Sequence, residues 1–156
     1  METNQPRKIM VVEDDPAMRE IVTHKLTANG FEVKQAEDGK KAVDLFAEEK
    51  PDLVLLDLML PEVDGFGVLK YIRGNQDPKL SNTPVIVLSN LWSNKDILSA
   101  QALRVQAYMV KAYFTTEEIL NKIKEILTQT QSGGLSPKQS AEPQVPDLST
   151  QTVTPS

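Results

Sequence analysis

Short apolar runs rich in β-branched residues alternate with longer amphipathic stretches over most of this 156-residue chain. Residues 9–12, 31–36, 53–56, 84–88 and 107–110 predict strands, and residues 16–28, 40–49, 65–73, 95–103 and 115–128 predict helices. Residues 75–82 predict a polar loop. Such an alternation indicates βαβ units, and burial on both faces explains why most of the strands are continuous apolar runs. We therefore expect an α/β fold, a doubly wound sheet of five parallel strands.

The composition changes near residue 132. Residues 8–131 carry the alternating pattern and are expected to form one domain. Residues 132–156 are rich in Ser, Thr, Gln and Pro, and large apolar residues are isolated there. Such a segment cannot bury enough apolar surface to offset the entropy of ordering, so it predicts a disordered tail. The residues leave open whether this tail is a docking segment or a vestigial end.

Charge and cysteine content exclude several classes of protein. The net charge of -5 argues against sequence-independent nucleic-acid binding, which needs clustered Lys and Arg. The absence of cysteine excludes disulfides, zinc-thiolate sites and cysteine nucleophiles. The polar N-terminus lacks the apolar core of a signal peptide, and no apolar run approaches the roughly 20 residues that span a bilayer. We expect a cytoplasmic protein without membrane insertion.

Polar residues follow four of the predicted strands at the point where each strand ends. Glu13 and Asp14 come after the first strand, Asp57 after the third, Ser89 after the fourth and Lys111 after the fifth. In an open parallel sheet the binding crevice lies outside the carboxyl ends of the strands. These carboxylates, the hydroxyl and the lysine are therefore expected to converge at one edge.

This set of residues suits phosphoryl transfer. Crowded carboxylates repel each other and need a counter-ion, and oxygen ligands without His or Cys suit Mg²⁺. A carboxylate beside such an ion can attack phosphorus and form an aspartyl phosphate. The metal and a lysine would then neutralise charge on the phosphoryl oxygens.

With these residues in place, the chain resembles the response-regulator receiver family over residues 8–128. The matching segments are residues 9–16, 52–57, 58–61, 64–65, 84–89 and 108–111. The resemblance implies a flavodoxin-like fold with strand order 2-1-3-4-5. It also implies that Asp57 is the phosphoacceptor. Glu13, Asp14, Asp57 and the backbone carbonyl of Met59 would hold Mg²⁺ or Mn²⁺.

The same resemblance implies a switch. Ser89 would bind the phosphoryl group, and Lys111 would pair with its oxygens. Tyr108 matches the family's switch aromatic, which turns inward when the hydroxyl residue moves. Phosphorylation would shift an equilibrium between two arrangements of Ser89, Tyr108 and the surrounding surface.

Three positions depart from the family pattern, and one of them is Arg104-Val105, which stands before the fifth strand where the family usually has Gly-Ala. Ala112 follows Lys111 where the family usually has a proline after a cis peptide bond, so the sequence leaves the conformation of this bond open. Asn90 follows Ser89 where a small residue is usual. Trp92, in the same loop, is either an anchor for a partner or a residue packed over the sheet edge.

The leading hypothesis is a stand-alone receiver of a two-component phosphorelay, a phosphoacceptor and not an enzyme apart from its own phosphorylation and dephosphorylation. A histidine kinase or a histidine phosphotransfer protein would supply the phosphoryl group. The output would be docking to a protein target that the sequence does not identify, or homodimerisation. Both would use the fourth helix, fifth strand and fifth helix, and neither involves nucleic acid directly.

Three alternatives are weaker. A constitutive interaction module with this fold and no productive phosphotransfer is suggested by Asn90 and Ala112. A metal-dependent phosphohydrolase would need a second aspartate two residues after the nucleophile, where Met59 stands. A flavin or dinucleotide binder would need a Gly-rich turn after the first strand, where Glu13 and Asp14 would repel a phosphate.

Overall fold

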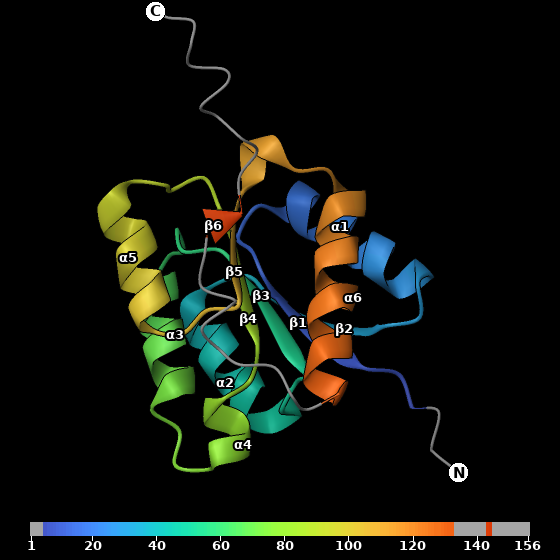
Figure 1. Cartoon of the computed structure of the whole chain (residues 1–156), viewed down its shortest axis with the longest axis horizontal. Helices are drawn as coiled ribbons and strands as arrows, with labels where there is room; N and C mark the ends of the chain where they lie inside the picture. Colours follow the sequence, from blue (N-terminus) through green and yellow to red (C-terminus); the bar gives the residue numbers. More distant parts are fainter. Residues whose placement is uncertain (1–4, 133–142, 145–156) are drawn as a thin grey trace, which may run out of the picture.

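A parallel sheet covered by helices on both faces makes up the described part of the chain, residues 5–132 and 143–144 of a computed structural model (Figure 1). The strand order is β2-β1-β3-β4-β5-β6, and all neighbouring strands are parallel. The strands are β1 (Lys8–Val12), β2 (Glu32–Ala36), β3 (Leu53–Leu56), β4 (Val85–Ser89), β5 (Ala107–Val110) and β6 (Pro143–Gln144). The predicted α/β fold with strand order 2-1-3-4-5 is confirmed.

The helices form two layers. They are α1 (Pro16–Ala28), α2 (Gly39–Glu49), α3 (Gly65–Arg73), α4 (Pro78–Ser81), α5 (Asn94–Ala102) and α6 (Thr116–Ser132), with a 3₁₀ turn η1 (Lys111–Tyr113). Helices α1 and α6 cover one face of the sheet, and α2, α3 and α5 cover the other (Figure 1). No helix in the described part of the chain is both long enough and apolar enough to cross a bilayer.

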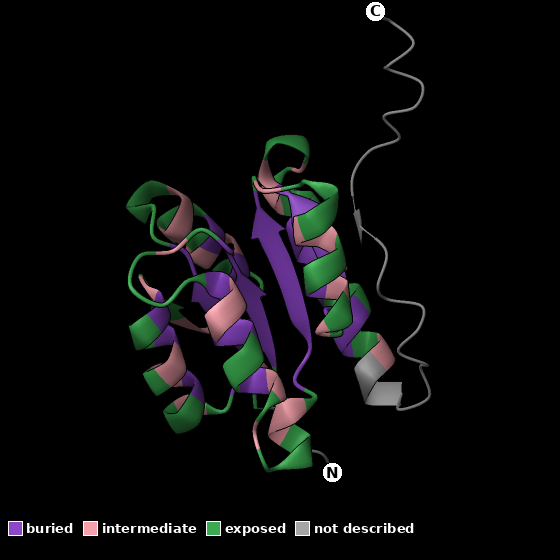
Figure 2. Cartoon of the chain, turned by 90° about the vertical axis from the view of Figure 1, so that its left-hand side faces the viewer, coloured by how far each residue is buried: buried purple, intermediate pink, exposed green. Residues whose placement is uncertain are grey.

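The sheet separates two hydrophobic cores. Ile9 and Val11 of β1 pack toward α1 and α6, whereas Met10 and Val12 pack toward α2, α3 and α5. Successive side chains of a strand point to opposite faces, so one apolar run supplies both cores. Figure 2 shows the consequence, with strands buried between helices whose outer faces are exposed. This explains the continuous apolar runs in the sequence.

Several helices begin where capping residues stand. Asp15 caps α1 by accepting a hydrogen bond from the amide of Ala17, and Pro16 occupies the first turn, where it loses no helical hydrogen bond. The side chain of Asp64 caps α3 in the same way, accepting from the amide of Gly67 at 2.9 Å. The sequence therefore predicts the starts of α1 and α3 correctly.

The predicted polar loop over residues 75–82 is wrong in part. Its centre forms the single-turn helix α4, which Asp77 caps by accepting from the amide of Lys79 at 3.0 Å. Pro78 sets the backbone of the first turn. A polar stretch without an apolar stripe shows no helical period, so only the Asp-Pro pair signals this turn.

Strand β6 lies within the range predicted as a tail. It pairs in parallel with β5, with Pro143 opposite Tyr108 and Gln144 opposite Met109. Proline donates no hydrogen bond, which suits an edge strand. Of residues 132–156, the structure otherwise describes only Ser132, the end of α6; the remainder of the predicted tail lies outside the described residues.

A partly buried arginine joins three segments near the amino ends of β4 and β5. Arg73 ends α3, and its guanidinium donates at 2.7–3.5 Å to the carbonyl oxygens of Ser81, Thr83, Leu103 and Arg104 and to the side chain of Gln106. Burial, with a contribution from the charge of Arg104, lowers the pKa of Arg73 to about 10. The group is still charged at neutral pH and satisfies carbonyls that no secondary structure pairs.

Candidate functional site

Three carboxylates meet at the carboxyl ends of β1 and β3. Glu13 and Asp14 directly follow β1, and Asp57 directly follows β3, its neighbour in the sheet. One oxygen from each carboxylate lies within 4.8 Å of the others. Glu13 and Asp57 are buried, and Asp14 is exposed. The structure thus brings the predicted acidic residues together.

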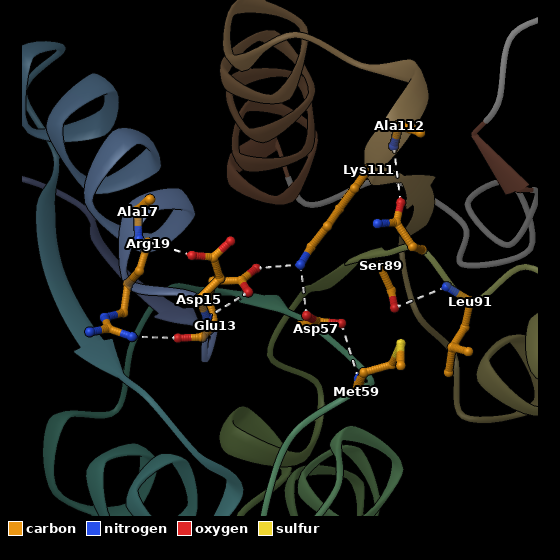
Figure 3. Close-up of polar contacts among 11 residues, drawn as sticks. Glu13, Asp15, Ala17, Arg19, Asp57, Met59, Ser89, Leu91, Lys111 and Ala112 are labelled. Carbon is orange, nitrogen blue, oxygen red and sulfur yellow. Dashed lines mark hydrogen bonds and ion pairs between the residues drawn. The ribbon is translucent and has the colours of Figure 1, made fainter.

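Lys111 reaches between the two buried carboxylates (Figure 3). Its ammonium nitrogen lies 2.7 Å from Glu13 Oε1 and 2.8 Å from Asp57 Oδ2. Burial acts to lower the pKa of Lys111, but hydrogen bonds to Asp57 and Glu13 and the charges of both carboxylates raise it above its ordinary value. Lys111 is therefore a cation at neutral pH and neutralises part of the acidic cluster.

The loop after β1 is held in place on both sides of Glu13. The side-chain Oε2 of Glu13 accepts a hydrogen bond from the amide of Asp15 at 3.1 Å. The carbonyl oxygen of Glu13 accepts one from the guanidinium of Arg19 on α1 at 2.8 Å. Burial raises the pKa of Glu13, and its hydrogen bonds to Lys111 and Asp15 oppose that effect. The residue is thus positioned by contacts that are independent of any bound ion.

Each oxygen of Asp57 has its own partner. Oδ1 accepts from the amide of Met59 at 3.0 Å, and Oδ2 accepts from Lys111. The amide of Asp57 itself donates to the carbonyl of Val12 at 3.0 Å, which ties the residue to β1. Met59, predicted to offer its carbonyl to a metal, thus lies beside Asp57, and its side chain is exposed. The carboxylate is held in one orientation by an amide of its own loop and by the ammonium of Lys111 in η1.

The start of α3 packs directly against the backbone of this loop at Gly65. A Cβ atom at this position would lie 2.4 Å from both the carbonyl oxygen of Asp57 and the Cα atom of Leu58. A side chain there would displace the segment that carries Asp57. This close approach explains why glycine stands after Asp64 in the sequence.

We expect Gly65→Ala to lower the free energy of unfolding by about 1–3 kcal/mol because backbone atoms must shift to admit the methyl group. Chemical denaturation measures this. Gly74→Ala is the control, since a methyl group added there would lie 3.2 Å from the nearest backbone atom. Equal stabilities for the Gly65 variant and the wild type would contradict the close packing.

Ser89 and Tyr108 are linked through Leu91. Ser89 is the last residue of β4 and fully buried, and its Oγ accepts from the amide of Leu91 at 3.3 Å (Figure 3). Tyr108 is fully buried in β5, and its hydroxyl donates to the carbonyl of Leu91. Burial, with the charges of Asp96 and Asp57, raises the pKa of Tyr108, so the hydroxyl keeps its proton. The predicted switch aromatic points inward in this structure.

The peptide bond between Lys111 and Ala112 is trans. All peptide bonds in the described part of the chain are trans, and Lys111 to Tyr113 form η1. The conformation that the sequence left open is therefore a trans bond followed by a 3₁₀ turn. Lys111 reaches the carboxylates from this turn.

The acidic cluster fits a hard divalent cation. Its donors are carboxylate oxygens only, with no imidazole or thiolate, which is the ligand chemistry that Mg²⁺ prefers. Two of the carboxylates are buried and fixed by hydrogen bonds, and Asp14 faces solvent. Glu13, Asp14 and Asp57 are the side chains that could hold such an ion.

The sequence does not indicate the role of Arg19. Its hydrogen bond joins a side chain on α1 to a backbone carbonyl after β1. No residue pattern specifies a contact of this kind, because any helical arginine at the surface looks the same in the sequence. The available signal in the sequence is that Arg19 follows Glu13 by six residues, with the helix-capping Asp15 between them.

Comparison with known proteins gives the family. The family model of the response regulator receiver domain matches residues 9–124. The "Probable transcriptional regulator ycf27" of Cyanophora paradoxa is 37% identical over 136 residues, which cover 87% of this chain and 54% of that protein. The "DNA-binding dual master transcriptional regulator RpaA" of Synechocystis sp. is 36% identical over 123 residues, covering 79% and 50%. The chain spans about half the length of the curated relatives it matches.

Solved structures agree with the sequence match. The receiver domain of the Francisella response regulator 1452 superposes with a TM-score of 0.71 at 29% identity, covering 80% of this chain and 98% of that one. The chain belongs to the response-regulator receiver family.

Proposed function

We propose that this domain is a phosphorylation-controlled switch in which Asp57 accepts a phosphoryl group in a reaction that requires Mg²⁺. One observation carries the proposal: the Lys111 ammonium bridges the buried carboxylates of Glu13 and Asp57 beside the solvent-facing Asp14. A buried nucleophile, a fixed cation and an open acidic position are the components of phosphoryl transfer to a carboxylate.

The proposed step forms one bond and breaks one. A carboxylate oxygen of Asp57 attacks the phosphorus of a phosphohistidine on a histidine kinase or phosphotransfer protein. The phosphorus–nitrogen bond breaks, and its electron pair returns to the imidazole nitrogen of the donor. Lys111 would pair with a phosphoryl oxygen as the charge of Asp57 is spread over the acyl phosphate. The Ser89 hydroxyl would donate a hydrogen bond to a second phosphoryl oxygen.

Glu13, Asp14 and Asp57 would hold the divalent cation, together with the carbonyl of Met59. A bound cation would neutralise the negative charge that the phosphoryl oxygens bring into an already acidic site. The exposed position of Asp14 supports its role as the ligand nearest to solvent. Mn²⁺, with similar preferences for oxygen ligands, would substitute.

Asp14→Asn is expected to weaken Mg²⁺ binding by at least about tenfold, since even residues that only support a ligand have effects of this size. Isothermal titration calorimetry measures the affinity. Asp15→Asn is a matched control: it removes a neighbouring charge, and asparagine preserves the cap of α1. Equal losses in the two variants would show a general charge effect and contradict the assignment of Asp14 as a ligand.

Phosphorylation would act through Ser89 and Tyr108 on the surface formed by α5, β5 and α6, which are the predicted fourth helix, fifth strand and fifth helix. The shared contact of Ser89 and Tyr108 with Leu91 supports this coupling. The output would be docking of a protein target or a second copy of the domain at that surface, in the cytoplasm. One relative is named a DNA-binding regulator, so a stand-alone receiver without contact to nucleic acid stays a prediction.

Phosphoramidate, a small donor with a phosphorus–nitrogen bond, tests the proposal. The wild-type protein with Mg²⁺ is expected to give a retarded band on a phosphate-affinity gel, and Asp57→Asn is expected to give none. Removing Mg²⁺ with EDTA should abolish the retarded band. Absence of the band with every donor would favour the constitutive interaction module instead.

A further inference from the structure

The backbone next to Lys111 is held by a side chain from another loop. Asn90 directly follows β4, and its Oδ1 accepts a hydrogen bond from the amide of Ala112 at 3.1 Å. Figure 3 shows this bond as the dashed line that starts at Ala112. Asn90 is the residue after Ser89, and Ala112 is the residue after Lys111. The bond therefore joins the segments that carry the two groups assigned to the phosphoryl oxygens.

This hydrogen bond fixes the peptide group between Lys111 and Ala112, whose carbonyl is that of Lys111. The Lys111 carbonyl and the Ala112 amide lie in one plane, since the peptide bond is rigid. The amide side is held by Asn90, and the carbonyl oxygen accepts from the amide of Phe114 at 3.4 Å. With both sides held, the direction in which the Lys111 side chain leaves the backbone is restricted.

A second contact supports the same junction between the loops. The rings of Trp92 and Tyr113 meet edge to face, with centroids 5.8 Å apart and an interplanar angle of 81°. Both side chains are partly exposed. The loop after β4 and the turn η1 are thus joined by a hydrogen bond and an aromatic pair, beside the site but not in it.

We propose that Asn90 is a positioning residue for Lys111, an inference that rests on the proposed function of Lys111. Asn90 acts through the Ala112 amide to hold Lys111 where its ammonium meets Asp57. Two of the departures from the family pattern are thereby one feature: Ala112 provides an amide that proline lacks, and Asn90 provides an acceptor that a small apolar residue lacks. Each is useful only with the other.

Asn90→Ala is expected to slow phosphorylation of Asp57 by acetyl phosphate and Mg²⁺ by about three- to tenfold, the effect of one hydrogen bond. The effect is moderate because Asn90 and Ala112 are both exposed, so that water can hydrogen-bond to the Ala112 amide when the Asn90 side chain is removed. Asn94→Ala is the matched control, an exposed asparagine at the start of α5. Its rate should equal that of the wild type.

A double-substitution cycle separates positioning from a general structural role. If Asn90 acts through Lys111, Asn90→Ala has little further effect on the rate in a Lys111→Met background. Equal losses in both backgrounds would overturn the proposal, because the loss would not depend on Lys111.

The ¹⁵N signal of the Lys111 ammonium provides a measurement that needs no phosphotransfer. An ammonium held between two buried carboxylates exchanges slowly and gives a resolved signal, identified by its absence in Lys111→Met. Asn90→Ala is expected to shift or broaden it toward the signals of exposed lysines, and Asn94→Ala to leave it unchanged. An unchanged signal in Asn90→Ala would overturn the proposal. If the Lys111 signal changes in Asn90→Ala but neither the wild type nor any variant is phosphorylated, the proposed function of Asp57 is refuted and the positioning role of Asn90 is retained.

Discussion

Replacing Lys111 with methionine is expected to slow phosphorylation of Asp57 by about 100- to 1000-fold, the effect of removing one fixed charge-stabilising group from an active site. Methionine preserves most of the side-chain volume and removes the charge. The ammonium that lies 2.8 Å from Asp57 Oδ2 is then absent when the phosphoryl group arrives. Rates follow from intact mass as a function of time with acetyl phosphate and Mg²⁺.

Two further variants define the origin of that loss. Lys95→Met removes an exposed charge from α5 and should leave the rate unchanged. Lys111→Arg keeps the charge but presents a planar group of a different shape, so an intermediate rate is expected. A Lys111→Met rate close to that of the wild type would contradict the role of the ammonium.

Replacing Arg73 with leucine is expected to lower the free energy of unfolding by about 2–4 kcal/mol. The substitution leaves several partly buried carbonyl oxygens without a donor, and each unsatisfied group of this kind costs about 1–3 kcal/mol when water cannot reach it. The partners lie before β4 and between α5 and β5, so loss of Arg73 loosens three segments together. Urea denaturation followed by circular dichroism measures the change.

Lys70→Leu is the matched control for this prediction. Lys70 lies on the same helix and is exposed, so the same change of chemistry should have a small effect on stability. Arg73→Lys should fall between the two because one ammonium cannot reach all of the carbonyls. Similar stabilities for Arg73→Leu and Lys70→Leu would show that the arginine contacts contribute little.

The strands could be predicted because β1, β3, β4 and β5 are buried on both faces, whereas their order in the sheet was expected only from the resemblance to the receiver family. The runs at residues 53–56 and 107–110 coincide with β3 and β5, since nothing polar interrupts the apolar residues. Helix α6 continues to Ser132, past the predicted end at residue 128. The apolar stripe ends earlier than the backbone helix does, so hydrophobic periodicity marks the packed part of a helix and not its last turn.

The residues of the site could be predicted, but their supporting contacts could not. Strand ends determine where Glu13, Asp57 and Lys111 lie, and these ends are visible in the sequence. The bond between Asn90 and Ala112 depends on how two loops meet, which no local pattern specifies. The sequence marks both residues as departures, and the structure shows that they contact each other.

The inward orientation of Tyr108 is a further point that the sequence leaves open. Resemblance to the family predicts a switch between two arrangements, and the structure contains one of them, with the hydroxyl bonded to Leu91. The inward and outward arrangements of Tyr108 differ little in free energy, because large changes in packing and in hydration nearly cancel. Composition and spacing carry no information about the sign of this difference.

The position of the phosphoryl group on the protein can be measured directly. The protein is incubated with acetyl phosphate and Mg²⁺, the acyl phosphate is reduced with borohydride, and peptide mass spectrometry identifies the converted residue. Conversion to homoserine is expected at Asp57 and at no other carboxylate, with no conversion when Mg²⁺ is omitted. Conversion at Glu13 or Asp14, or no conversion of wild-type protein, would contradict the assignment of Asp57 as the phosphoacceptor.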